Sequence, residues 1–226
     1  MLTCKNCDQE GDEKFCSRCG QVLVATRISL PHIIHEVIHT FTHFEKGYLF
    51  TIRQLLTRPG IMQKNYLSGL RLHYQKPFPV FVISGTICAL ALYLIYTPSH
   101  DTAEQFFYRN YYVLVQALML PIYALLSWIL FSSSRLYYAE MLVLNVYMLG
   151  FMSLIVIPVN ALHFFLNNGV VTLIEATLLT AYNIWTYLNF FKGKPAWLIA
   201  IKSAANVILS FVLFQVAANL LMKWLM

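Results

Sequence analysis

Charged residues are scarce in this sequence. Only 12% of its 226 residues are Asp, Glu, Lys or Arg, and 58% are hydrophobic, whereas a soluble domain has about 25% charged residues. Apolar runs of about 20 residues, the length that crosses a bilayer as a helix, follow one another after Lys76. The shortage of charge excludes a soluble globular domain and predicts an all-α integral membrane protein.

Motifs of several protein classes are also missing. The sequence has no glycine-rich loop that would cradle phosphate, no elbow around a nucleophilic serine and no redox-cofactor signature. It lacks the paired carboxylates and Gly/Pro-broken helix pairs that are typical of ion-coupled transporters. The first residues are polar, so we expect no secretory signal peptide. These absences favour a protein that is not an enzyme.

Four of the five cysteines stand near the N-terminus in the pattern C-x2-C-x8-C-x2-C. They are Cys4, Cys7, Cys16 and Cys19. Each C-x2-C pair can point two thiolates at one ion, and two pairs complete a tetrahedral Zn²⁺ shell. We predict a structural zinc ribbon over residues 1–26, with Phe15 and Val22 as a small apolar core and metal binding as the main source of folding free energy. Reduced thiols place it in the cytoplasm; two disulfide or redox-active pairs are the alternative.

Residues 27–76 form a basic region before the first predicted span. Seven Lys/Arg against two Glu give it a net charge of +5, which favours contact with anionic lipid over nucleic acid. From Pro31 to about Phe50, apolar residues fall on one helical face and histidines on the other. This periodicity predicts an amphipathic helix in the membrane interface.

The polar face of this predicted helix contains the motif HEVIH. His35 and His39 are one turn apart, Glu36 is placed as the general base of a zinc protease, and His43 is a further ligand candidate. A catalytic zinc site needs a closed, dry cleft, whereas this face is expected to meet water. We interpret the motif as a solvated helix face; a second metal site and a membrane metalloprotease with Glu36 as catalytic base stay open.

The following segment reads GYLFTIRQLLTRPG, then YLSGLR, then YQKPF before an apolar run. With the N-terminal cysteine pairs, it resembles the uncharacterised bacterial zinc-ribbon multi-pass membrane family, domain of unknown function 3667. The matching residues are Gly47, Thr51, Leu55, Pro59, Gly60, Tyr66, Gly69, Arg71, Tyr74, Pro77 and Phe78. Leu70 stands where many relatives carry lysine. The resemblance covers about residues 1–85 and implies architecture and bacterial origin, but no activity.

The same segment predicts two short helices and a basic surface. Pro59 and Gly60 end one helix, and Gly69 ends a second helix over residues 61–68. Basic and aromatic residues here predict a collar at the membrane surface, formed by Arg58, Lys64, Tyr66, Arg71, Tyr74 and Lys76. The collar would bind anionic head groups or another phosphate-bearing ligand; an ordinary positive-inside anchor is the alternative.

Residues 77–226 predict a five-helix transmembrane bundle. The predicted spans are 77–97, 111–131, 141–165, 170–190 and 197–222. With the N-terminus in the cytoplasm and the C-terminus in the periplasm, the inner segments carry fourteen Lys/Arg and the outer ones two. Polar residues inside spans are functional candidates, here Asn145, Glu175, Asn183 and Lys202. We expect the asparagines to link helices, and Glu175 and Lys202 to reach opposite membrane surfaces.

Together these patterns predict a non-enzymatic protein of the bacterial inner membrane. The zinc ribbon would recognise or scaffold an unknown protein partner, and the collar would contact anionic lipid; a homo-oligomer stays open. A metalloprotease using HEVIH is one alternative. A small carrier or lipid transporter is the other, and it requires a polar cavity that reaches Asn145, Asn183 and Glu175.

Overall fold

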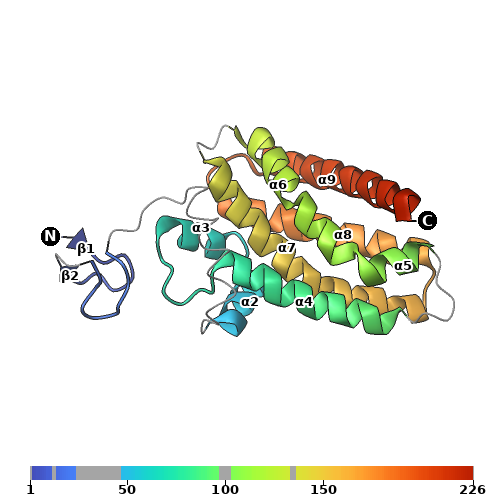
Figure 1. Cartoon of the computed structure of the whole chain (residues 1–226). Coiled ribbons are helices and arrows are strands. Elements are labelled where there is room, and N and C mark those ends of the chain that lie inside the picture. The colour runs from blue at the N-terminus through green and yellow to red at the C-terminus, as the bar shows by residue number, and fades with distance from the viewer. Residues whose placement is uncertain (1, 12–13, 24–46, 97–102, 133–135, 226) are drawn as a thin grey trace.

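The structure is a computed structural model of the whole chain, and it describes residues 2–11, 14–23, 47–96, 103–132 and 136–225. It is mostly helical, with a small two-stranded head (Figure 1). The described elements are β1 (Leu2–Thr3), β2 (Glu10–Gly11), α2 (Tyr48–Thr57), α3 (Ile61–Ser68), α4 (Pro77–Ile95), α5 (Ala103–Asn110), α6 (Tyr112–Leu130), α7 (Tyr138–Ala161), η3 (Leu162–Phe164), α8 (Asn168–Phe190) and α9 (Ala196–Leu225). The head, α2 and α3 lie at one end of the bundle, and α5 and the C-terminus lie at the other.

In the described part of the chain, four helices are long and apolar enough to cross a membrane. They are Pro77–Ile95, Tyr112–Leu130, Tyr138–Phe164 and Ala196–Trp224. The fifth predicted span falls on α8, which has 23 residues but also Glu175, four threonines and several asparagines. The chain is therefore a membrane-like helical protein with four candidate spans, and the fifth span stays a prediction.

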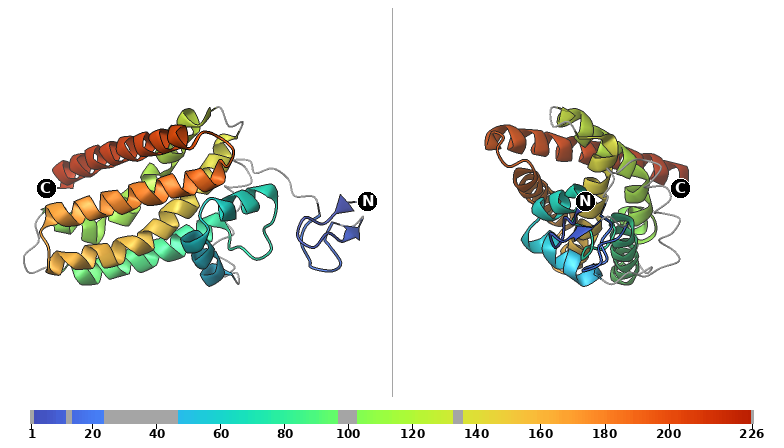
Figure 2. Two further views of the ribbon diagram at one scale, coloured as in Figure 1. Left: turned by 180° about the vertical axis from the view of Figure 1, so that it is seen from behind. Right: turned by 90° about the vertical axis from the view of Figure 1, so that its left-hand side faces the viewer.

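Helix α7 forms the centre of the bundle. In its most apolar window 72% of the residues are buried, against 28–33% for the other three candidate spans. It packs along α4 and α6, while α9 packs on α6 and α8 (Figure 2). At Gly150 a Cβ atom would lie 3.1 Å from the Phe81 Cα atom, so the missing side chain allows α4 and α7 to approach closely.

The two short helices before the bundle form as the sequence predicts. Helix α2 ends at Thr57, α3 begins after Gly60, and Gly69 ends α3 in a left-handed conformation. Gly60 has a φ of +79°, and a Cβ atom there would clash with the Thr186 carbonyl oxygen of α8. The turn between α2 and α3 is therefore fitted against the C-terminal part of α8, where only glycine has room.

A chain of buried hydrogen bonds joins this corner to the bundle. The Gln75 backbone N–H donates to Thr51 Oγ1 at 2.8 Å, and the Tyr147 hydroxyl donates to the Gln75 carbonyl at 2.6 Å. The Tyr182 hydroxyl of α8 donates to the Leu55 carbonyl of α2 at 3.2 Å. These bonds satisfy backbone groups that would otherwise be buried without partners, and they fix α2 on α7 and α8.

Candidate metal centre and bundle cavity

The head consists of two turns with the same backbone design. After Cys4, the Asp8 N–H donates to the Cys4 carbonyl, and after Cys16, the Gly20 N–H donates to the Cys16 carbonyl. Asp8 and Gly20, the equivalent residues, both have positive φ, at 58° and 74°. Strands β1 and β2 pair antiparallel around the first turn, with Leu2 opposite Gly11. Each turn thereby directs two cysteine side chains toward the other turn.

The four cysteine sulfur atoms converge on one point. They all lie within 4.8 Å of one another; Cys4 Sγ is 3.6 Å from Cys19 Sγ, and Cys7 Sγ is 3.5 Å from Cys16 Sγ. These distances exclude disulfides, and a tetrahedral Zn²⁺ ion with bonds of about 2.3 Å holds its sulfur atoms roughly 3.8 Å apart. The four side chains therefore fit a metal ion with four thiolate ligands. Among the described residues, no other group of this kind is present.

The thiols of this cluster ionise unequally. The Gln21 backbone N–H, helped by the Cys4 and Cys7 side chains, lowers the pKa of the Cys19 thiol to about 7. The Gln9 backbone N–H lowers the pKa of the Cys7 thiol, but loss of solvation and the neighbouring thiols outweigh it and raise this pKa to about 12. The Cys19 thiolate forms readily while the Cys7 thiol holds its proton, and a divalent cation would displace that proton.

The apolar residues of the head are arranged differently from the prediction. Phe15 and Val22 pair across the second turn, but they are 51% and 41% exposed. Leu23, at 5% exposure, is the residue that packs on the cysteines. The expected core of Phe15 and Val22 is wrong because, beside this isolated bridge, Val22 faces outward and its neighbour Leu23 faces inward.

The head is attached to the end of α3. The Gln21 side-chain amide donates to the Gly69 carbonyl at 2.6 Å, and this contact is buried. Lys5 Nζ donates to the Ser68 carbonyl at 3.0 Å. Ser68 is the last residue of α3 and Gly69 is its C-cap, where carbonyl groups lack partners within the helix. One side of the head is thus fixed, and the exposed pair Phe15 and Val22 remains on its surface.

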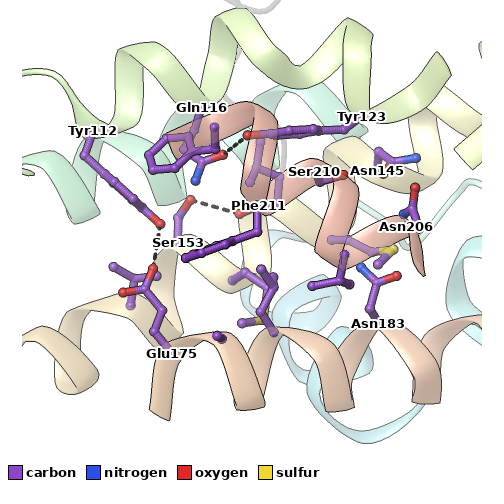
Figure 3. A pocket seen from close by; sticks show the side chains of 18 of the residues that line it. Tyr112, Gln116, Tyr123, Asn145, Ser153, Glu175, Asn183, Asn206, Ser210 and Phe211 are labelled. Carbon is purple, nitrogen blue, oxygen red and sulfur yellow. Dashed lines mark hydrogen bonds between the residues drawn. The ribbon is translucent and has the colours of Figure 1, made fainter. Parts of the chain in front are cut away.

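A second candidate site is a cavity of about 90 Å³ inside the bundle. Side chains of α5, α6, α7, α8 and α9 line it, and its polar lining includes Asn145, Ser153, Glu175, Asn183, Asn206 and Ser210 (Figure 3). This volume has room for several water molecules at about 15 Å³ each. Three of the four intramembrane residues named from the sequence, Asn145, Glu175 and Asn183, therefore meet at one cavity.

Hydrogen bonds hold most of the polar lining in place. The Tyr112 hydroxyl donates to Glu175 Oε1 at 3.2 Å, and the Tyr123 hydroxyl donates to Gln116 Oε1 at 3.1 Å. The Asn145 amide donates to the Met141 carbonyl at 2.9 Å.

Lys202, the fourth intramembrane residue, does not line the cavity. Its Nζ atom donates to the Leu130 carbonyl at 2.7 Å and so caps the end of α6.

The predicted collar residues occupy different depths. Arg58 and Lys64 are exposed, Arg71, Tyr74 and Lys76 are half-buried, and Tyr66 is buried. The Tyr66 ring meets the Tyr147 ring edge-on at 5.4 Å, and the Arg71 guanidinium lies 5.4 Å from the Tyr66 ring centre. The buried Tyr66 ring therefore packs against the Arg71 guanidinium, and the basic side chains form the accessible part of the collar.

This corner and the first part of α4 match a known protein family. Residues 45–88 match the model of a family described as protein of unknown function (DUF3667). The predicted resemblance is confirmed over this segment. No curated protein and no solved structure matches the chain.

The DUF3667 segment contains the collar but neither the four clustered cysteines nor the cavity. The HEVIH motif, with His35, Glu36, His39 and His43, and most of the predicted interfacial helix lie outside the described residues. Sequence reasoning missed the aromatic lining of the cavity and Ser210. Asn206 and Ser210 are one helical turn apart, so both polar side chains lie on one face of α9. This spacing could have indicated from the sequence that Ser210 belongs to the polar lining of the cavity.

Proposed function

We propose that the chain is a five-span protein of the bacterial inner membrane whose zinc ribbon and basic segment bind a protein partner and anionic lipid at the cytoplasmic face. The closed set of four cysteines supports a structural Zn²⁺ ion, because no position is left open for a substrate. The fixed attachment of the head to α3, with Phe15 and Val22 exposed on its surface, carries the proposal of a protein-recognition module.

Helix α2 supports the lipid contact. Leu49, Arg53 and Leu56 lie along one face of this helix, and all three are exposed, Leu49 by 81%. A short helix with leucines and an arginine on its outer face suits the boundary between acyl chains and head groups. The exposed cation Arg58 follows at its end, and the exposed Lys64 lies on the next helix, α3. Both would bind anionic head groups there.

Lipid retention tests this surface. The full chain is purified from mixed phosphatidylglycerol and phosphatidylcholine, and the retained lipids are quantified. We expect wild type to enrich phosphatidylglycerol, Arg58→Ala/Lys64→Ala to lose that enrichment, and Lys223→Ala at the opposite end of the bundle to keep it. Equal enrichment by all three proteins would refute the lipid contact.

Photo-crosslinking tests the ribbon. A photoreactive residue at position 15 is expected to capture one defined protein in membranes. The same residue at the exposed position 118 of α6 is the control and should not capture it. Failure to crosslink from position 15, or the same product from both positions, would contradict recognition through the ribbon.

The cavity favours a second candidate function, that of a small carrier or lipid transporter. This alternative requires a polar cavity that reaches Asn145, Asn183 and Glu175, and all three residues line one. Uptake of candidate solutes into proteoliposomes containing the full chain tests it, with protein-free liposomes as the control. A metalloprotease using His35, Glu36 and His39 stays a prediction, and the zinc count proposed below tests it.

A further inference from the structure

We propose that the bundle cavity binds a small organic cation, with its ammonium group at Glu175 and its carbon chain extending along aromatic and methionine side chains toward Asn183. This inference deepens the carrier function proposed above by naming a ligand class. It concerns equilibrium binding, which can exist without transport.

The charge of the cavity selects a cation. Glu175 is the only acidic residue between positions 141 and 226, and its carboxylate lines the cavity beside the Tyr112 hydroxyl (Figure 3). None of the described residues that line the cavity is Lys, Arg or His. The nearest intramembrane lysine by sequence, Lys202, donates to the Leu130 carbonyl instead. A carboxylate in such a site requires a positively charged partner or a proton.

The walls favour an organic cation over a metal ion. Tyr108 and Tyr112 stack at 5.0 Å and 15°, and Phe214 meets Tyr112 edge-on at 5.7 Å. Aromatic rings of this kind attract alkylammonium ions. A hard metal ion instead needs about six oxygen ligands at one point. Here the oxygens are spread from Glu175 to Asn183, which are eight residues or about 12 Å apart along α8.

Asn183 marks the other end of the site. Its side chain lines the cavity and is only 8% exposed, and its Oδ1 atom has no hydrogen-bond partner within the described chain. A buried acceptor left unpaired is unfavourable, so a donor on a ligand or a bound water is expected there. Met148, Met152 and Leu179 also line the cavity and provide apolar surface for a carbon chain.

A neighbouring cavity is the candidate entry route. A second cavity of about 260 Å³ is lined by α5 and α9 side chains, including Gln215 and Asn219. Tyr108 and Phe214 line both cavities. The second cavity lies toward the C-terminal end of α9, and we expect the cation to enter the bundle from that end.

Equilibrium binding to the purified full chain in detergent tests the inference, with three probes of matched size. They are n-butylammonium, n-butanol and butyrate, which differ in charge. We expect butylammonium to bind at least tenfold more tightly than the other two, and sodium at equal concentration not to displace it. Glu175→Gln should lower the butylammonium affinity at least tenfold, and Glu140→Gln, which removes a carboxylate outside the cavity, should not.

The outcomes separate this inference from the carrier function. Equal binding of butanol and butylammonium to wild type would overturn the inference without any variant, and so would displacement by sodium. If Glu175→Gln fails to fold, Glu175→Asp takes its place and should retain the preference for butylammonium over butanol. Binding without uptake into proteoliposomes would refute the carrier alone, and uptake of another solute without butylammonium binding would refute this inference alone.

Discussion

At the scale of single residues, the head shows how little sequence is needed to build a metal centre. The two cysteine pairs already predict four converging ligands, and the structure brings their sulfur atoms within 4.8 Å. The role of Asp8 was harder to foresee, because it takes a left-handed conformation for which glycine is the usual signal, as Gly20 is in the second turn. Asp is tolerated there because its short polar side chain can bond locally.

A zinc count per chain tests the metal centre and the HEVIH motif together. We expect one Zn²⁺ ion in wild type and one in His35→Ala/His39→Ala, because a four-thiolate shell is complete by itself. Cys16→Ser should lose its zinc to a chelator that leaves wild type loaded. Elemental analysis gives the count. Two ions in wild type and one in the histidine variant would make the histidines ligands and favour the metalloprotease.

Proton release tests the unequal ionisation of the cysteines. Zinc binds thiolates, and the pKa of Cys19 in the metal-free cluster is lowered to about 7. At pH 6 this thiol still holds its proton, and at pH 8 it has lost it. We therefore expect zinc binding to release about one proton more at pH 6 than at pH 8, and zinc affinity to fall as the pH is lowered. Calorimetry in buffers of different ionisation enthalpy measures the release; equal release at both pH values would contradict the assignment.

At the scale of helices, local rules predicted boundaries well and burial poorly. Pro59, Gly60 and Gly69 act through the backbone, so the ends of α2 and α3 could be predicted from neighbouring residues alone. The burial of Tyr66 could not, because it depends on Tyr147, which is far away in the sequence. Likewise, a helical wheel cannot show that Gly60 rests on α8.

Two glycine substitutions, one at the turn between α2 and α3 and one at the turn between α8 and α9, distinguish backbone strain from close packing. Gly60 and Gly193 both have positive φ, but a Cβ atom at Gly193 meets nothing within 4 Å, whereas at Gly60 it would clash with the Thr186 carbonyl. We expect Gly193→Ala to cost about 1 kcal/mol from conformation alone. Gly60→Ala should cost at least about 2 kcal/mol more, because α3 or α8 must move. Thermal unfolding in detergent compares them, and equal losses would show that the close contact is unimportant.

At the scale of the whole molecule, hydropathy predicted the helices but not the cavity between them. The cavity needs polar side chains from several helices to meet at one place, and no one-dimensional pattern records that meeting. Glu175 shows the difference. From its position near the end of a span it was expected to reach the membrane surface, yet its carboxylate pairs with Tyr112 of α6 and lines the cavity. Glu175 also makes α8 more polar than the four helices that are apolar enough to be candidate spans.

Whether α8 crosses the membrane decides the topology of the protein. With the N-terminus in the cytoplasm, as proposed, a crossing α8 gives five spans and places the turn with Lys192 and Lys194 in the cytoplasm and Lys223 outside. If α8 does not cross, that turn lies outside and Lys223 lies inside. The positive-inside rule favours the crossing, because it puts two lysines rather than one in the cytoplasm. The length of α8, 23 residues or about 35 Å, is sufficient, and its contacts with α7 and α9 run within the bundle.

Reporter fusions test this arrangement. Alkaline phosphatase fused after α9 is expected to be active, because it folds only outside the cytoplasm, and green fluorescent protein at the same point should stay dark. Inserted at Gly193, where the chain turns at the surface between α8 and α9, the two reporters should behave in the opposite way. A fluorescent C-terminal fusion together with an active phosphatase at Gly193 would show that α8 does not cross.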